Sequence, residues 1–384
     1  MGGEEAPVSG WCAPGYHPVR DAFVRNFAEG GEVGAAVHVI RGGEVVVDLV
    51  GGWADEARTR PWTPDTIVDV YSVGKGLLSL LVLQLVDAGE IHLDDPVARI
   101  WPAFAAGGKD TATVAHALTH RAAVPAVREH LTDEDLFDWE RMTTAIAATD
   151  AWWVPGERLA YHVNTFGHLH GELVRRVTGQ MPGDRLRAVA EPLAADVWFG
   201  VPDGEQPRCA DVIWAPPDPL PEVSGFEGLE GDVLMSALAH VNPPGYSSIG
   251  VVNTARWRSA QIGSTSGHAS ASGVARIYAA MLEPGRLLTP GLLAEAAAPQ
   301  ASGHCPILGR DVTFGWGFQP TTPARPLGPN SRSFGHFGTG GALGFADPDA
   351  MVAFGYVMNH VIPRWQSDRN RALVDALYGV VSPA

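Results

Sequence analysis

The chain has 384 residues, of which 46% are apolar and 18% are charged. This composition is sufficient for a large hydrophobic core and argues against an intrinsically disordered chain. The formal net charge of −16 argues against nucleic acid as a partner, because phosphate backbones are bound by basic surfaces, and it also disfavours an anionic membrane surface.

The first predicted elements are a helix and a β-hairpin. Apolar residues recur at helical spacing over 19–27, and the helix is expected to stop at Gly30-Gly31. The segments 35–41 and 44–50 are rich in β-branched residues and flank a Gly-Gly turn. This pattern is typical of an antiparallel hairpin.

Helices dominate the predicted middle of the chain. Residues 72–88 are nearly all apolar and precede Gly89, which indicates a buried helix with a glycine stop. A second helical run covers 166–178, and the Pro-rich segment 215–221 is expected to be a loop.

The last predicted elements are two strands and a helix. Two strand-like runs, 343–346 and 351–358, flank an Asp-Pro turn, and an amphipathic helix over 368–378 follows them. Strands at both ends predict an α+β fold, in which an antiparallel sheet from both chain ends is flanked by helices and a mostly helical region is inserted. The expected sheet region comprises residues 1–70 and 275–384. The expected helical region comprises residues 71–274.

The most informative motif is Ser72-Val73-Gly74-Lys75, in which a serine and a lysine lie three residues apart at the start of the apolar helix. Residues i and i+3 share a helix face, so the lysine amine can reach the serine hydroxyl. Burial lowers the pKa of a lysine, and the neutral amine can then act as the base that activates a serine nucleophile. An arginine could not do so, because it keeps its proton in proteins.

The scarcity of lysine supports this interpretation. Of the 27 basic residues only Lys75 and Lys109 are lysines, so arginine serves wherever positive charge alone is needed. The alternative is a helix-capping serine followed by a lysine whose amine extends to solvent. The rival motif G-x-S-x-G is absent, since 245–249 ends in isoleucine and 263–267 has threonine at its centre.

Two further segments carry candidate chemistry. Tyr161 lies in the stretch 155–165, which begins with Pro-Gly and leads into an apolar helix. A glycine-rich run covers 334–341. Taken alone, the tyrosine is more typical of half-buried packing and the glycine run of a tight strand connection.

In this order, the motifs resemble those of the serine β-lactamase and penicillin-binding-protein superfamily, specifically its class C-like branch, and most of all the family VIII carboxylesterases. The resemblance spans about residues 20–380 and implies one β-lactamase-like catalytic unit. It rests on three motifs and three supporting matches: Ser72-x-x-Lys75, Tyr161, His336-Phe337-Gly338, Leu118-Thr119-His120, Thr265-Ser266-Gly267-His268 and 344–348.

The resemblance implies a role for each motif residue. Ser72 would be acylated, while Lys75 and Tyr161 would share the work of general base and general acid. Near a cationic lysine, Tyr161 would lose its proton unusually easily. The oxyanion hole would be formed by the backbone N–H groups of Ser72 and Thr339, and no cofactor is implied.

Two departures from the family pattern bear on the substrate. β-Lactamases of this branch carry Tyr-x-Asn, whereas position 163 here is valine and Asn164 follows one residue later. They also carry Lys-Thr-Gly where this chain has His336-Phe337-Gly338. The missing lysine is expected to help hold a β-lactam carboxylate, so the resemblance favours esters that need no carboxylate. His336 is expected to donate a hydrogen bond in the substrate site, which Gly338 would also line.

Trp152 and Trp153, just before the tyrosine motif, are further candidates for substrate binding. Either could line an acyl pocket. The alternative for both is aromatic core packing.

No metal site, membrane segment or export signal is expected. His116 and His120 are spaced i,i+4 but lack the glutamate of H-E-x-x-H, and the three cysteines lie far apart without CxxC spacing. The N-terminus lacks a basic start followed by an apolar run, and no stretch approaches roughly 18 apolar residues. The protein is therefore expected to be cytoplasmic.

The predicted function is a cofactor-independent serine carboxylesterase that hydrolyses small to medium carboxylic esters through an acyl-enzyme on Ser72. Its expected partner is a small-molecule ester or acyl compound. Alternatives with the same machinery are an acyltransferase, an amidase or D-peptidase, and a weak β-lactamase. A non-catalytic ligand-binding relative is the alternative from another class. The natural substrate and the oligomeric state stay open.

Overall fold

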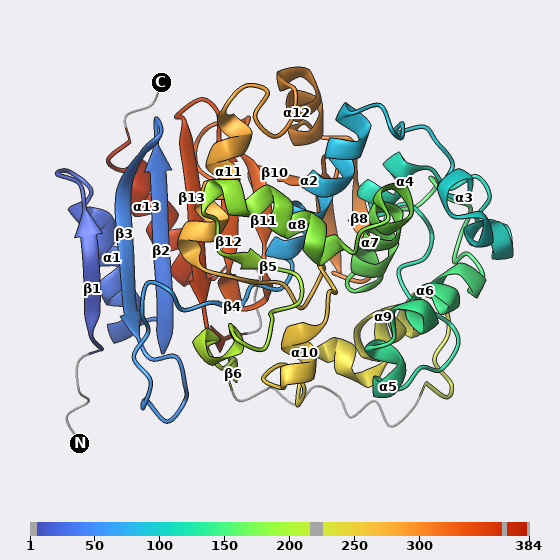
Figure 1. Cartoon of the computed structure of the whole chain (residues 1–384), viewed down its shortest axis with the longest axis horizontal. Coiled ribbons are helices and arrows are strands. Elements are labelled where there is room, and N and C mark those ends of the chain that lie inside the picture. The colour runs from blue at the N-terminus through green and yellow to red at the C-terminus, as the bar shows by residue number, and fades with distance from the viewer. Residues whose placement is uncertain (1–5, 216–225, 363–366, 382–384) are drawn as a thin grey trace.

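The computed structural model describes residues 6–215, 226–362 and 367–381. A seven-stranded antiparallel sheet lies at one side of the molecule and a mostly helical region at the other (Figure 1). This arrangement confirms the predicted α+β fold. The predicted loop 215–221 lies, apart from Ala215, outside the described residues.

Both ends of the chain contribute strands to the large sheet. These strands are β1 (Val8–Cys12), β2 (Gly34–Arg41), β3 (Glu44–Gly52), β10 (Gln319–Pro320), β11 (Phe334–Phe337), β12 (Leu343–Asp347) and β13 (Val352–Met358). Their order across the sheet is β1-β3-β2-β13-β12-β11-β10. The predicted hairpin is confirmed, because β2 and β3 pair around Gly42 and Gly43, whose positive φ angles of 57° and 85° suit a tight two-residue turn. At the centre of the sheet β2 pairs with β13.

Helices cover both faces of this sheet (Figure 1). Helices α1 (His17–Ala28) and α13 (Asp368–Tyr378) pack together on one face, and α11 (Ala271–Leu282) lies against β2, β12 and β13 on the other. The approach of α11 is close, since a Cβ at Gly355 would lie 2.2 Å from the Ala271 carbonyl oxygen. Helix α11 thus crosses the expected boundary at residue 274 while packing on the sheet, and the division of the chain into two regions stays a prediction.

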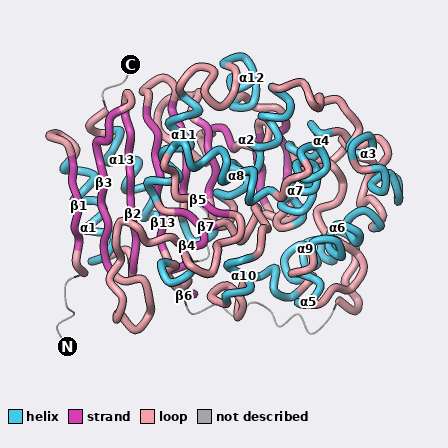
Figure 2. Tube along the Cα trace, viewed as in Figure 1, coloured by secondary structure: helices cyan, strands magenta, loops and turns pink. Residues whose placement is uncertain are grey.

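The apolar helix predicted over 72–88 is α2 (Val73–Asp87), and it is buried along nearly its whole length. Figure 2 shows it among the helices of the inserted region, where it contacts α7 (Thr165–Thr178), while β11 of the sheet contacts it as well. Contacts on more than one side explain why its surface is apolar all round. The remaining α-helices of the described residues are α3 (Val97–Ile100), α4 (Val114–Leu118), α5 (Asp133–Leu136), α6 (Trp139–Ala148), α8 (Pro182–Ala190), α9 (Gly231–Val241), α10 (Ala255–Ser259) and α12 (Pro290–Ala297).

Three small sheets complete the fold. They consist of β4 (Val68–Asp69), β7 (His268–Ala269) and β5 (Val197–Trp198); of β6 (Ile213–Trp214) and β14 (His360–Val361); and of β8 (Ala301–Cys305) and β9 (Arg310–Phe314). Strand β4 ends just before Ser72, and its pairing with β7 brings the segment around Ser264 alongside. Within the described ranges, no helix is both long and apolar enough to cross a membrane.

The close packing of α11 on the sheet predicts the effect of Gly355→Ala. The added Cβ would collide with the Ala271 carbonyl oxygen, so the helix must shift away from β13. We expect a loss of about 1–3 kcal/mol in the free energy of unfolding, measured by urea denaturation. Gly303→Ala in β8 is the control, because its Cβ would meet nothing within 4 Å. Equal stability of the two variants would contradict this packing.

Candidate active site

Ser72 and Lys75 meet at the N-terminus of α2. Ser72 occupies the N-cap position of the helix without a capping hydrogen bond from its side chain, and Lys75 lies in the first turn. Lys75 Nζ is 2.9 Å from Ser72 Oγ and also donates a hydrogen bond of 2.9 Å to the Ser264 carbonyl oxygen. Lys75 is fully buried and Ser72 is 5% exposed. The predicted contact across one helical turn is therefore present, in an environment that excludes most water.

The turn before Ser72 is held by a buried carboxyl group. Tyr71 has a positive φ of 48°, a conformation that L side chains rarely adopt. Asp69 Oδ1 accepts a hydrogen bond from the Tyr71 N–H, and its Oδ2 accepts one from the Trp257 indole N–H, both at 2.8 Å. Burial raises the pKa of Asp69 to about 8. These bonds keep the strained turn in place and direct Ser72 towards Lys75.

Burial alone moves the pKa of Lys75 well below its ordinary value. The charged ammonium is disfavoured away from water, so the neutral amine is the stable form. A neutral amine has a lone pair that can accept the Ser72 hydroxyl proton. The lysine therefore has both the geometry and the protonation state of a general base.

Tyr161 lies against the same lysine. Its ring centroid is 4.8 Å from Lys75 Nζ, and its side chain is hydrogen-bonded to Ser72. Burial raises the pKa of Tyr161, and the Ser72 hydrogen bond and the charge of Arg325 offset only part of that rise. The expectation of an easily lost proton is wrong, because it assumed a cationic Lys75. Tyr161 keeps its proton and can donate it.

Three side chains fix the position of Tyr161. Its N–H donates to Cys305 Sγ at 3.2 Å, and its ring stacks on Phe314 with centroids 5.9 Å apart. The ring of His120 lies 4.6 Å away on centroids. No motif pointed to Cys305 or Phe314, which contact Tyr161 from the β8–β9 pair.

The predicted oxyanion hole lies where β11 ends. A Cβ at Gly338 would lie 2.4 Å from the Val70 carbonyl oxygen, so only glycine lets this backbone approach the segment that carries Ser72. In the part of the chain that the structure describes, neither the Ser72 nor the Thr339 N–H donates to a backbone carbonyl. Both groups are therefore available to an oxyanion, and their pairing in an oxyanion hole stays a prediction.

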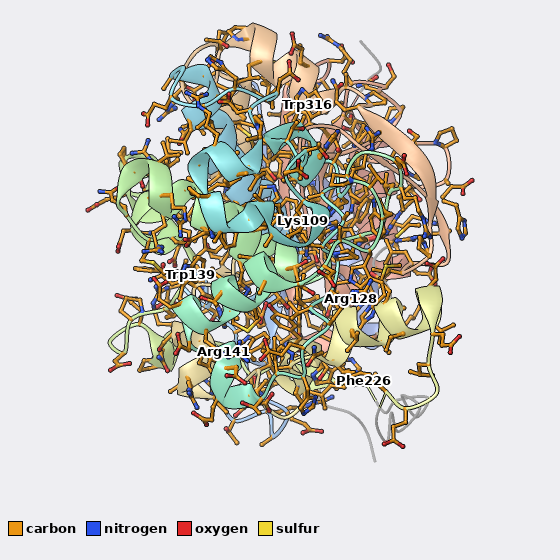
Figure 3. All side chains as sticks on the ribbon, turned by 90° about the vertical axis from the view of Figure 1, so that its right-hand side faces the viewer. Lys109, Arg128, Trp139, Arg141, Phe226 and Trp316 are labelled. Carbon is orange, nitrogen blue, oxygen red and sulfur yellow. The ribbon has the colours of Figure 1, made fainter. Side chains whose placement is uncertain are left out.

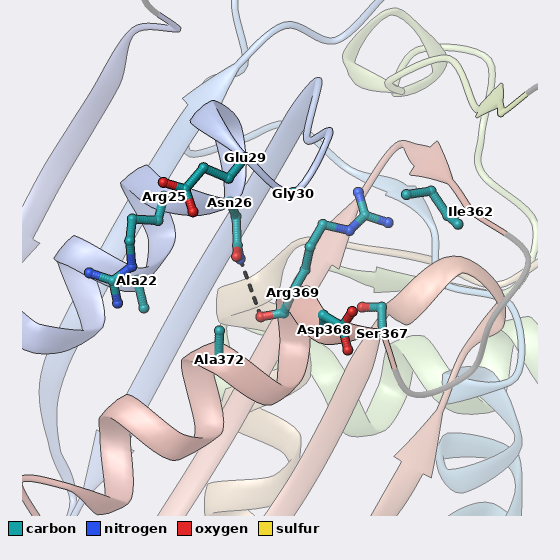
Figure 4. Close-up of a pocket in the computed structure, with 10 residues that line it drawn as sticks. All are labelled: Ala22, Arg25, Asn26, Glu29, Gly30, Ile362, Ser367, Asp368, Arg369 and Ala372. Carbon is teal, nitrogen blue, oxygen red and sulfur yellow. Dashed lines mark hydrogen bonds between the residues drawn. The ribbon is translucent and has the colours of Figure 1, made fainter.

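The turn after Thr339 is anchored by α13. Arg369 Nη2 donates to the Gly340 carbonyl oxygen and Asn370 Nδ2 to that of Gly341, both at 2.8 Å. Arg369 is itself held by a buried ion pair with Glu32, 2.7 Å between Nη1 and Oε1. Figure 4 shows Arg369 at the cavity of about 470 Å³ between α1 and α13, where its own carbonyl accepts from the Asn26 side chain. Helix α13 thus holds in place the turn that follows Thr339, whose N–H belongs to the predicted oxyanion hole.

The structure changes the expectation for His336. This residue is fully buried, and burial with the nearby Lys75 lowers its pKa to about 3. Its Nδ1–H donates to the Phe337 carbonyl oxygen at 2.9 Å, so the neutral ring has no proton left on Nε2. His336 Nε2, which has no partner among the described residues, can only accept a hydrogen bond. The expected donation into the substrate site is therefore wrong.

The two tryptophans pack beside Tyr161. Trp152 and Trp153 are half-buried against the small hydrophobic cluster that contains Tyr161. The Trp152 indole N–H donates to the Ala126 carbonyl oxygen at 2.8 Å, and the Arg128 guanidinium lies 3.6 Å from its ring centroid, on the face of the helical region seen in Figure 3. These contacts are those of packing residues, and a role in substrate binding stays a prediction.

Ser264 is the residue that reasoning from the motifs missed. Its carbonyl oxygen accepts from Lys75 Nζ, and its hydroxyl donates to the Asn164 carbonyl oxygen at 2.8 Å. Close backbone packing brings this segment to Lys75, because a Cβ at Gly74 would lie 2.2 Å from the Gly263 carbonyl oxygen. Within the described ranges, no three His, Cys, Asp or Glu side chains gather in a way that could hold a metal ion.

Comparison with known proteins identifies close relatives. A family model described as Beta-lactamase matches residues 20–378. The curated protein "Esterase/beta-lactamase LipL" of Mycobacterium tuberculosis is 33% identical over 370 residues, which cover 92% of this chain and 83% of that protein.

Two solved structures are also similar over nearly their full length. One is a family VIII carboxylesterase, 34% identical with a TM-score of 0.88, covering 97% of this chain and 100% of that one. The other is a penicillin-binding protein homolog from Caulobacter crescentus, 37% identical with a TM-score of 0.88 and the same coverage. These structures confirm the β-lactamase-like fold that the motif resemblance implied.

The lowered pKa of Lys75 predicts a pH dependence for the reaction of Ser72. The amine is a base only above its pKa, so the rate of Ser72 labelling by a fluorophosphonate should fall as the pH drops through that lowered value. The rate should already be level well below the ordinary lysine pKa of about 10.4. A rate that rises towards pH 10 would contradict a neutral, buried lysine. Lys75→Arg, which cannot lose its proton, should abolish labelling at every pH.

Proposed function

The chain belongs to the Beta-lactamase family and is a serine hydrolase, and on this premise we propose that it is a carboxylesterase acting through an acyl-enzyme on Ser72. The observation that carries the proposal is the 2.9 Å contact between Lys75 Nζ and Ser72 Oγ at a buried site. This contact supplies a neutral base to the serine hydroxyl.

In the first step, Ser72 Oγ attacks the ester carbonyl carbon while its proton passes to Lys75 Nζ. The carbonyl π electrons move to oxygen, and the resulting oxyanion is bound by the N–H groups of Ser72 and Thr339. Preorganised donors of this kind each lower a barrier by about 3 kcal/mol. The lysine becomes an ammonium only at this stage, when a negative charge forms close to it.

In the second step, the bond between the carbonyl carbon and the alcohol oxygen breaks. Tyr161 donates its proton to the departing oxygen and recovers a proton from the Lys75 ammonium. The raised pKa of Tyr161 supports this role, because the phenol is protonated at neutral pH. Water then attacks the acyl carbonyl carbon while Tyr161 accepts a proton from the water and passes its own to Lys75. The bond between the carbonyl carbon and Ser72 Oγ breaks, the Lys75 ammonium returns a proton to Ser72 Oγ, and the carboxylic acid is released.

The substrate is proposed to be a small to medium carboxylic ester. The names of two relatives, an esterase/β-lactamase and a family VIII carboxylesterase, support ester chemistry. A cavity of about 560 Å³ lies beside the Tyr161 cluster, with Phe314 and Phe337 but neither Ser72 nor Tyr161 in its lining. At the position of the β-lactamase lysine the chain has the neutral His336, so that position supplies no charge for a carboxylate, while Arg325 is a cation in the lining of the same cavity.

The first test is Ser72→Ala with p-nitrophenyl esters. Removal of the nucleophile should lower kcat by at least about 10³-fold, to the background rate. Ser9→Ala, at an exposed serine on the edge strand β1, is the matched control and should leave kcat unchanged. Undiminished turnover by Ser72→Ala would rule out the assignment of the nucleophile.

The second test compares esters with β-lactams. Because His336 is neutral, nitrocefin hydrolysis should be a trace, with kcat/KM at least about 10²-fold below that for p-nitrophenyl esters. Comparable values for the two substrates would instead favour β-lactamase activity, which the name of one relative includes.

A further inference from the structure

His120 occupies an unusual position at the end of α4. The helix ends at Leu118, and His120 has a φ of 60°, in the left-handed region where asparagine and histidine are enriched among non-glycine residues. Its side chain is fully buried. The mechanism proposed above makes no use of it.

The hydrogen bonds of His120 lie on both sides of Tyr161. The carbonyl oxygen of His120 accepts from the Ala160 N–H at 3.2 Å. Its ring atom Nδ1 accepts from the His162 N–H at 3.1 Å. His120 therefore binds the backbone N–H groups of the residues before and after the tyrosine, while its ring packs 4.6 Å from the Tyr161 ring on centroids.

His162 reinforces the same connection. Its Nδ1–H donates to the Ala160 carbonyl oxygen at 2.7 Å, and its Nε2 accepts from the Val124 N–H at 3.3 Å. The segment 160–162 is thus joined to the segment 120–124 by side-chain and backbone bonds. These bonds hold the backbone of Tyr161 in one position.

These bonds require one form of the His120 ring. Because Nδ1 accepts, the single proton of the neutral ring is on Nε2. Burial, with the neighbouring His162, Lys75, His336 and His170, holds the pKa of His120 well below its ordinary value. The ring stays neutral at any pH at which the enzyme would work, so Nδ1 remains an acceptor.

We propose that His120 is a positioning residue for the reaction, which sets the hydroxyl of Tyr161 against Ser72 and the leaving group by binding the peptide N–H groups on either side of the tyrosine. The proposal rests on the proton-donating role of Tyr161 in the proposed function. It predicts that loss of His120 impairs protonation of the leaving alcohol more than attack by Ser72.

The experiment compares two esters with different leaving groups. An ethyl ester needs a proton for its departing alkoxide, whereas p-nitrophenolate leaves without one. His120→Gly removes the Nδ1 acceptor and tolerates the positive φ. It should lower kcat for the ethyl ester by about 10²-fold and kcat for the p-nitrophenyl ester only a few-fold, with KM nearly unchanged. Tyr161→Phe should show the same pattern.

Two variants serve as controls. His120→Asn also tolerates the positive φ, but its Oδ1 can replace Nδ1 as the acceptor, so it should recover most of the ethyl-ester rate. His168→Ala removes another buried histidine, one that is hydrogen-bonded to Tyr246. It should cost stability while leaving the ratio of the two rates unchanged. His120→Ala replaces His120→Gly if the glycine variant does not fold.

The outcomes separate this proposal from the proposed function. If Tyr161→Phe changes the ratio but His120→Gly lowers both rates equally, or if asparagine restores nothing, the positioning role of His120 is overturned alone. If Tyr161→Phe leaves the ratio unchanged, the proton-donating role of Tyr161 fails and this proposal fails with it. Neither result touches the role of Ser72, which its own variant tests.

Discussion

A lysine amine that is held out of water beside a serine hydroxyl is the constraint on which the site depends. Burial along α2 disfavours the charge on Lys75, and the same burial keeps Tyr161 protonated and His336 and His120 neutral. In the proposed mechanism these groups carry no charge before the reaction starts. Positive and negative charge then form together, an ammonium and an oxyanion, where low polarity strengthens their interaction with preorganised N–H groups.

Local geometry explains how much of the site could be predicted from the sequence. The contact between Ser72 and Lys75 follows from i,i+3 spacing on a helix, and the boundaries of that helix follow from its apolar run and its glycine stop. Tyr161 and His336 could be placed near Ser72 only through the family resemblance. The carbonyl of Ser264 could not be predicted, because its approach depends on packing between segments about 190 residues apart. The prediction that Tyr161 loses its proton easily was wrong, because it assumed a charged Lys75. Burial lowers the pKa of Lys75 and raises that of Tyr161.

The two lysines show that scarcity alone is a weak argument for catalysis. Lys109, like Lys75, is inaccessible to solvent, and its amine donates to the carbonyl oxygens of Ala106 and Thr149. Burial lowers its pKa to about 8. Lysine is therefore retained at two buried positions where a compact amine reaches backbone carbonyls. What distinguishes Lys75 is the serine hydroxyl beside it, not its rarity.

The pairing of β2 with β13 at the centre of the sheet has a consequence for the synthesis of the chain. His38 pairs with Gly355, so the middle of the sheet cannot close until all residues up to 355 have left the ribosome. Before β11 (Phe334–Phe337) has been synthesised, the apolar α2 lacks this neighbour and is exposed to association with other chains. Closing so large a loop is also slow. A chain that ends before residue 352 would therefore lack β13. The strands β2 and β12 would then both lose a pairing partner, although β2 lies near the other end of the chain.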